Sequence, residues 1–172
     1  FEGVDNYHAD PSWRIEARFT PAPVGQTVDI GNVLGQLIPM SVFGTVEFER
    51  EGRSHTLIGL GEEGSESLWF LFADRTTGRE TYGAGRFLYS DGMPEDGRLV
   101  VDFNKAYNPP CAFNDYSTCP LPPHVVHLLG CLPLATPVPV HSPQVSWRVN
   151  SIVFSVPLEI SSSVNCTVVS RS

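Results

Sequence analysis

Residues Trp13-Arg14-Ile15-Glu16-Ala17-Arg18-Phe19 decide the fold class, because apolar and charged side chains alternate strictly along them. Successive side chains of a β-strand point to opposite faces, so a pattern with a period of two predicts a half-buried strand. The charged residues would face water. The buried face would hold the apolar residues Trp13, Ile15, Ala17 and Phe19.

Further stretches downstream are interpreted as strands of the same sheet. Glu51-Gly52 is a typical turn pair, so we expect a hairpin that joins two of these strands. Turn residues recur about every eight to twelve positions, which is typical of β-sandwiches and barrels. No apolar stripe with a helical period runs long enough to predict a helix. The expected strands are Val42–Glu49, Ser54–Leu60, Ser67–Ala73, Arg86–Tyr89 and Arg98–Asn104.

The predicted fold is therefore mainly β, an antiparallel barrel-like or sandwich domain. Ser67–Ala73 carries large apolar residues in an unbroken row, which indicates a short strand buried on both faces. The large side chains that we expect in the core are Trp13, Phe48, Trp69, Phe70 and Phe103.

Length and composition restrict the function classes. With 172 residues, of which 41% are hydrophobic, the chain can bury the core of one ordinary domain. Its net charge of −8 disfavours a nucleic-acid partner and adhesion to anionic membranes, because both require a basic surface. No run approaches about 18 consecutive apolar residues, so no membrane span is predicted. No signal peptide is recognisable, and the resulting expectation is an acidic, soluble protein in the cytoplasm.

Composition changes abruptly near Pro123. Residues 1–123 carry nine Lys/Arg and eighteen Asp/Glu, whereas residues 124–172 carry only three charged side chains together with nine Ser and five Pro. So few charges are unusual in a soluble segment. We therefore divide the chain into a β-rich domain, 1–123, and a low-charge Pro/Ser/Val tail, 124–172. The tail is expected to be poorly ordered, and to be a product of a frameshift, a retained intron or divergent sequence.

The first candidate for chemistry is the run 74–88, which reads D-R-T-T-G-R-E-T-Y-G-A-G-R-F-L. Asp74 fits turn chemistry, in which the side chain bonds nearby backbone, but it could also act as a general base or a metal ligand. Arg86 opens an apolar strand, where its guanidinium could bind an anionic ligand or pair with a carboxylate of the chain. Gly83-Ala84-Gly85 does not match a phosphate-binding loop and indicates a bulge or a close backbone approach.

The second candidate is the run 102–113, which reads D-F-N-K-A-Y-N-P-P-C-A-F. Because a buried charge needs a partner or a ligand, we predict that Asp102 and Arg86 share one polar cluster and face one cavity. The alternative is that the polar residues of this run fix the backbone of their own loop. The residues that could line the cavity are Asp74, Tyr82, Arg86, Asp102, Asn104, Tyr107, Asn108 and Cys111.

Cys111 and Cys119 lie close together in the sequence but lack the tight cysteine pairs and further ligands of a structural zinc site. Three states stay open. We expect reduced, buried thiols by default. A disulfide is the second state and would require an oxidising compartment, and a role as metal ligand or nucleophile is the third. The sequence indicates no metal site and no cofactor, and it does not specify an oligomeric state.

Together these runs resemble an uncharacterised family, domain of unknown function 1684, over residues 1–123. The family occurs in bacteria, archaea and fungi and has no established biochemical role. The resemblance therefore implies a similar fold but no particular activity. The similarity is carried by D-x-T-x-G-x-x-T-Y-G-A-G-R-F-L at 74–88, D-F-N-x-A-Y-N-P-P-C-A-F at 102–113, C-P-L-P-P at 119–123, W-R-I-E-A-R-F-T-P at 13–21 and G-T-V-E-F at 44–48.

The resemblance also has limits at both ends. Members of the family are longer at the N-terminus, and after C-P-L-P-P they continue with a run similar to E-N-R-L that is missing after Pro123. This difference implies a barrel-like domain that is incomplete at both ends.

The sequence leaves three functions open and does not decide whether the protein is an enzyme. The first is a β-rich protein that binds a small polar or anionic ligand in a pocket lined by Asp74, Arg86, Asp102 and their neighbours. The second is a small hydrolase-like enzyme, with Asp74 or Asp102 as base and Arg86 stabilising an anion. The third is a structural or interaction domain without a ligand.

Overall fold

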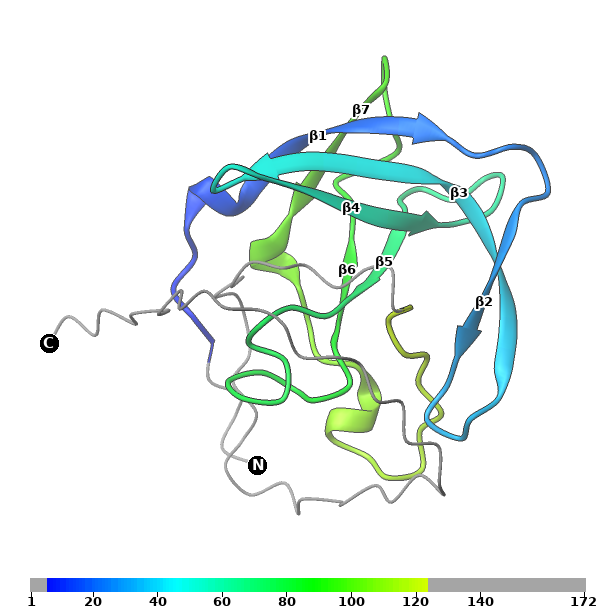
Figure 1. The fold of residues 1–172 in the computed structure, drawn as a ribbon, viewed down its shortest axis with the longest axis vertical. Helices are drawn as coiled ribbons and strands as arrows, with labels where there is room; N and C mark the ends of the chain where they lie inside the picture. The colour runs from blue at the N-terminus through cyan, green and yellow to red at the C-terminus, as the bar shows by residue number, and fades with distance from the viewer. Residues whose placement is uncertain (1–5, 124–172) are drawn as a thin grey trace, which may run out of the picture. The chain divides into compact units, whose positions relative to one another are not determined.

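The computed structural model describes residues 6–123, so the predicted tail lies outside the described residues. Within this range the chain forms one seven-stranded antiparallel sheet and three short 3-10 helices (Figure 1), none of them long and apolar enough to cross a membrane. The predicted mainly β fold is confirmed. The elements are η1 (Pro11–Trp13), β1 (Arg14–Pro21), β2 (Thr27–Gly31), β3 (Leu37–Arg50), β4 (Arg53–Leu60), β5 (Trp69–Phe72), β6 (Arg86–Tyr89), β7 (Arg98–Asp102), η2 (Phe103–Lys105) and η3 (Pro110–Ala112).

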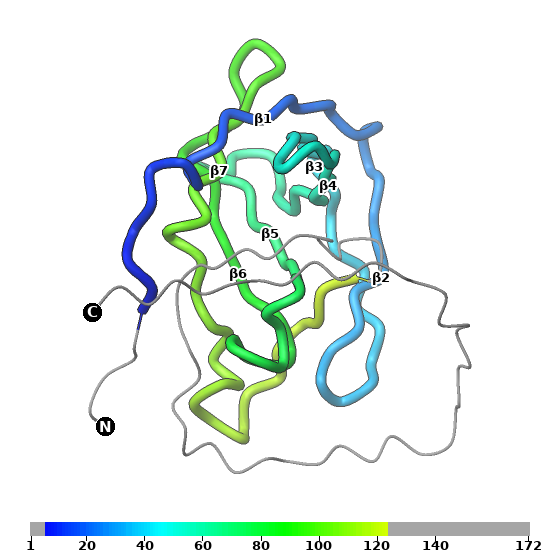
Figure 2. The backbone as a smooth tube through the Cα atoms, turned by 60° about the vertical axis from the view of Figure 1, so that its left-hand side comes forward, coloured from blue at the N-terminus to red at the C-terminus, as the bar shows by residue number. Residues whose placement is uncertain are grey.

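The strands follow the order β6-β5-β4-β3-β1-β7, and β2 pairs with the first part of β3 beside this path (Figure 2). The hairpin predicted at Glu51-Gly52 joins β3 to β4. Glu51 and Gly52 have φ angles of 51° and 71°, the two positive values that a type I′ turn requires. Such a turn matches the twist of the two strands that it connects.

The sheet curls so that the chain following β7 returns to the free edge of β6. Phe87 and Tyr107 exchange both of their backbone hydrogen bonds, each 2.9 Å long. Just after β6, the N–H of Asp91 donates to the carbonyl oxygen of Val100 in β7 at 3.1 Å. These bonds partly close the seam of a half-barrel, and the prediction of an incomplete, barrel-like domain is confirmed.

The concave face of the sheet holds an aromatic core. Trp13, Phe48, Phe70 and Phe103 are buried, as predicted. The ring of Phe103 lies 6.1 Å from that of Trp13 and 5.5 Å from those of Phe48 and Phe72, measured between ring centroids. Aromatic rings at these distances stabilise the core beyond the burial of their area alone.

The strand predicted at Ser67–Ala73 is buried on both faces, although β5 itself is shorter. Phe70 belongs to the aromatic core, whereas Leu71 packs in a second cluster on the other face of the sheet. Trp69 is half-buried against this second cluster. Trp69 therefore contributes to the second cluster and not to the aromatic core, because alternation along β5 turns it to the face opposite Phe70.

We expect Gly44 in β3 to tolerate no side chain. The chain has a register irregularity between Val42 and Gly44, and a Cβ at Gly44 would lie 2.5 Å from the carbonyl oxygen of Thr20 and would overlap the ring of Phe19. Gly44→Ala should therefore lower the free energy of unfolding by about 2 kcal/mol or more. Chemical denaturation measures this loss.

The matched control is Gly31→Ala in β2, where the nearest atom to a new Cβ is 3.9 Å away. This change should stay within about 1 kcal/mol of the parent chain. Equal effects of the two substitutions would contradict the packing of β1 against β3 at Gly44.

Candidate functional site

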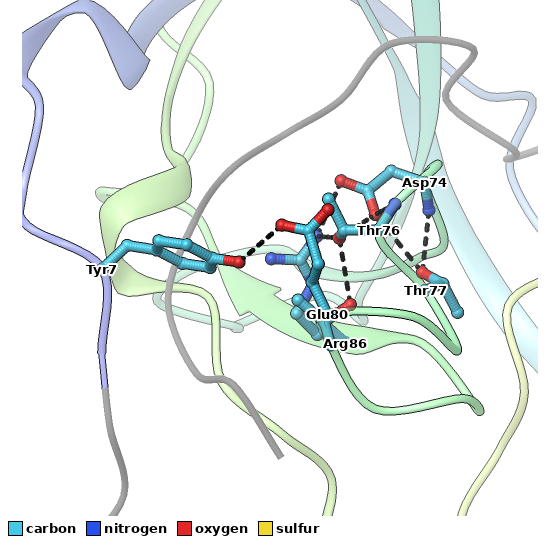
Figure 3. A network of polar contacts seen from close by, with 7 residues as sticks. Tyr7, Asp74, Thr76, Thr77, Glu80 and Arg86 are labelled. Carbon is cyan, nitrogen blue, oxygen red and sulfur yellow. Dashed lines mark hydrogen bonds and ion pairs between the residues drawn. The ribbon is translucent and has the colours of Figure 1, made fainter. Parts of the chain in front are cut away.

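A fully buried ion pair lies at the start of β6. Nη2 of Arg86 donates to Oδ2 of Asp74 at 2.8 Å, and neither side chain is exposed (Figure 3). The guanidinium carbon also lies 4.9 Å from the centroid of the Phe72 ring, within range of a cation–π contact. The sequence left open whether Arg86 binds an anionic ligand or pairs with a carboxylate of the chain, and the structure shows a pair with Asp74.

The turn after β5 fixes the Asp74 carboxylate. Its Oδ1 accepts hydrogen bonds from the backbone N–H of Thr76 at 3.0 Å and from Oγ1 of Thr76 at 2.6 Å. The N–H of Asp74 donates to Oγ1 of Thr77 at 3.0 Å, and the hydroxyls of Thr76 and Thr81 lie 3.0 Å apart. The turn chemistry considered for Asp74 is present, and it presents the carboxylate to Arg86 at the same time.

Gly85 makes room for Arg86 at the entrance of β6. Its φ angle is 86°, and a Cβ there would lie 2.7 Å from the carbonyl oxygen of Phe72 and 2.5 Å from Cγ of Pro122. Only glycine fits such a conformation and such a close approach. Gly85 thus allows Arg86 to pair in register with Phe72, the last residue of β5.

Asn108 lies opposite Arg86 on the neighbouring backbone. Phe87 and Tyr107 form a hydrogen-bonded antiparallel pair, so the flanking residues Arg86 and Asn108 face each other on the same side of the sheet. Asn108 is only 5% exposed. Within residues 6–123, neither its Oδ1 nor its Nδ2 has a hydrogen-bond partner.

A buried carboxamide without partners is uncommon in proteins, and leaving it so costs roughly 1–3 kcal/mol. We call Asp74, Thr76, Thr81, Arg86 and Asn108 the Arg86 cluster. Four of its members are joined by the ion pair and the threonine hydroxyls, and Asn108 adds a donor and an acceptor that have no partner within residues 6–123.

Tyr7 and Glu80 lie beside the cluster. The hydroxyl of Tyr7 donates to Oε2 of Glu80 at 2.9 Å (Figure 3). Burial and this bond to Glu80 raise the pKa of Tyr7 to about 12, while the charge of Arg86 lowers it more weakly. Tyr7 therefore stays a neutral donor over the whole physiological range. No local pattern in the sequence predicts this contact, because it joins residues that are far apart in the chain.

Asp102 lies outside the cluster, and its predicted association with Arg86 is not found. Its Oδ1 accepts from the N–H of Asn104 at 3.1 Å and from Nδ2 of Asn104 at 2.8 Å, which caps η2. Asn104 in turn clamps Asp10, since its Oδ1 accepts from the N–H of Asp10 and its Nδ2 donates to the carbonyl oxygen of Asp10, both at 2.9 Å. These two residues hold the segment that carries Tyr7.

The remaining predicted site residues occupy other places. The hydroxyl of Tyr82 donates to the carbonyl oxygen of Cys111 at 3.1 Å, and burial raises the pKa of Tyr82. Tyr107 points to the opposite face of the sheet, where its ring stacks on that of Tyr89. Cys111 forms a disulfide with Cys119, with their Cα atoms 6.1 Å apart, so the default of reduced thiols is wrong.

The charges of the site are nearly balanced. Burial lowers the pKa of Arg86, and the Asp74 carboxylate opposes that shift. An arginine side chain keeps its proton even so, and the pair is therefore a cation held against an anion. Glu80 adds a second carboxylate at the exposed side. Among the described residues, no group of three or more His, Cys, Asp or Glu side chains is arranged to hold a metal ion.

Comparison with known proteins gives a family and a similar structure. Residues 1–129 match the model of a family described as a protein of unknown function (DUF1684). The solution NMR structure of an uncharacterised protein of Haloarcula marismortui is similar, with a TM-score of 0.67 and 27% sequence identity over 83% of this chain and 80% of that one. No curated protein matches the chain.

We expect removal of the Asn108 carboxamide to leave the ligand-free protein as stable as before or more stable. Asn108→Leu eliminates a buried polar group that makes no internal hydrogen bond, so no bond is lost. The control is Asn32, which is equally buried but donates to Gln36 and accepts from the N–H groups of Leu34 and Gln36. Asn32→Leu should cost about 1–3 kcal/mol in urea denaturation. The same loss at both sites would show that Asn108 is satisfied.

We also expect strong coupling between Arg86 and Asp74. Arg86→Met alone leaves the buried carboxylate of Asp74 without its cation and should lower the free energy of unfolding by about 3–5 kcal/mol. Asp74→Asn keeps an oxygen for Thr76 while removing the charge. In a double-mutant cycle, the combined variant should be more stable than the sum of the single losses by about 1 kcal/mol or more. Additive losses would contradict the pair.

Proposed function

The chain belongs to the family of proteins of unknown function DUF1684, and we propose from its site that it binds a small polar ligand at the Arg86 cluster. The single observation that supports this proposal is the Asn108 carboxamide, which is 5% exposed and makes no hydrogen bond within residues 6–123. A ligand that bonds to both atoms would remove the cost of burying them. Binding sites commonly combine apolar walls with a few converging polar groups.

The groups around Asn108 are already held in place. Asp74 and Thr76 are fixed by the turn after β5, and Arg86 is fixed by its pair with Asp74 and by the ring of Phe72. Such preorganisation reduces the entropy that a ligand would lose on ordering the site. Of the pocket residues expected from the sequence, this proposal keeps Asp74, Arg86 and Asn108, and it gives Asp102 and Asn104 a supporting role.

The geometry favours binding over a hydrolase. Oδ1 of Asp74 accepts hydrogen bonds from Thr76, and Oδ2 accepts one from Arg86. Because both oxygens already have partners within the protein, this carboxylate is poorly placed to take a proton from water. Oδ1 of Asp102 likewise already accepts a hydrogen bond from the side chain of Asn104. An Arg86 that is neutralised by Asp74 is likewise a weak stabiliser of a developing anion.

The cytoplasmic location stays a prediction, and the Cys111–Cys119 disulfide weighs against it. Disulfides persist in oxidising compartments and are rare in the cytosol, where thiols are kept reduced. A structural role for this bond fits its position, since Cys111 also accepts the hydrogen bond of Tyr82.

A fragment screen of the whole chain tests the proposed function. In NMR spectra of the isotope-labelled protein, compounds that bind at the cluster should shift the side-chain amide signals of Asn108. Asn108→Leu should abolish this binding, as followed by the backbone amide signals of Arg86 and Phe87, whereas Asn114→Leu, at an exposed asparagine, should leave it intact. A diverse library that perturbs nothing near Arg86 would leave a structural or interaction domain without a ligand as the better conclusion.

A further inference from the structure

We propose that the ligand is electrically neutral and presents a hydrogen-bond donor beside an acceptor, as a primary carboxamide or a lactam does. This inference rests on the proposed function and concerns the ligand class of the same site. The sequence alone left a polar or an anionic ligand open, and the geometry around Arg86 and Asn108 separates these two classes.

The first reason is the bonding capacity of Asn108. Its Nδ2 can only donate and its Oδ1 can only accept, and within the described range both atoms are buried and without partners. A carboxylate offers acceptors alone and would leave Oδ1 unsatisfied. An ammonium or amidinium group offers donors alone and would leave Nδ2 unsatisfied. An amide edge matches both atoms at once.

The second reason is the charge that an ionic ligand would meet. The guanidinium of Arg86, which lies opposite Asn108, is already paired with Asp74 at 2.8 Å. Glu80, bonded to Tyr7 on the exposed side of the cluster, adds a second carboxylate. A carboxylate or phosphate would approach a neutralised cation and an additional anion, so the site attracts no anion.

The third reason is the apolar core that lies beside the Arg86 cluster. Ala106, two residues before Asn108, belongs to the buried aromatic core, and so does Phe72, whose ring faces Arg86. Transfer of an ion into such surroundings without a counter-ion is expensive, whereas a neutral amide loses little once it is hydrogen-bonded. The core therefore favours a ligand without net charge.

Planar compounds of equal shape and different charge test this ligand class. The probes are acetamide, acetate and acetamidinium, together with benzamide, benzoate and benzamidinium. In titrations followed by the side-chain amide signals of Asn108, each amide should bind at least tenfold more tightly than its charged counterparts. Tighter binding of the carboxylate or the amidinium at Asn108 would overturn the neutral class but support the proposed function. Failure of these probes and of the diverse library alike would overturn both.

Two substitutions test the specificity of the site. Because the Asn108 variants lack the side-chain amide, binding to them is followed by the backbone amide signals of Arg86, Phe87 and Tyr107. Asn108→Asp replaces the donor by an acceptor, so the preference should change from the amide to the amidinium by at least tenfold. Glu80→Gln should raise the relative affinity of the carboxylate several-fold, because it removes the nearby negative charge. If Asn108→Asp does not fold, Asn108→Leu serves instead and should bind all three probes equally weakly. An unchanged order of affinities in the folded Asn108 variant would overturn the proposal.

Discussion

The buried pair of Arg86 and Asp74 is the constraint on which the site depends. A guanidinium without any exposed surface is tolerable only beside a carboxylate, and that carboxylate must itself be bonded. The chain meets both demands locally, with the threonine-rich turn after β5 on one side and the positive φ of Gly85 on the other. The pair adds little net stability over an apolar alternative, so its value lies in fixing one arrangement of polar groups.

Much of the fold could be predicted from the sequence because its signals are local. Strict alternation along 13–19 and the turn pair Glu51-Gly52 each specify a strand or a hairpin without reference to the rest of the chain. β2 escaped prediction because it lies at the margin of the sheet. Ile30 is the one fully buried residue of this strand, and Leu37 opposite its end is exposed, so burial imposes no clear alternation on the strand.

The site was predictable only in part, because sequence patterns report local structure and part of the site is formed by contacts between distant segments. Asp74 and Arg86 lie in one sequence run, and a turn brings them together. Asp102 and Asn108 also share a run, but η2 turns the chain between them, so one caps that turn while the other reaches β6. Asn108 lies opposite Arg86 because Phe87 pairs with Tyr107. No local sequence pattern predicts this contact between distant segments.

The two sequence runs nevertheless serve one arrangement. The first run supplies the ion pair and Glu80, whereas the second supplies Asn108 and, through Asp102 and Asn104, the clamp on Asp10. That clamp fixes the segment carrying Tyr7, whose hydroxyl then bonds Glu80 beside Arg86. Asp102 therefore acts at a distance from the buried pair. Its carboxylate orients the side chain of Asn104, which in turn holds the backbone of Asp10. This indirect role explains why a second carboxylate belongs to the run 102–113 without lying in the Arg86 cluster.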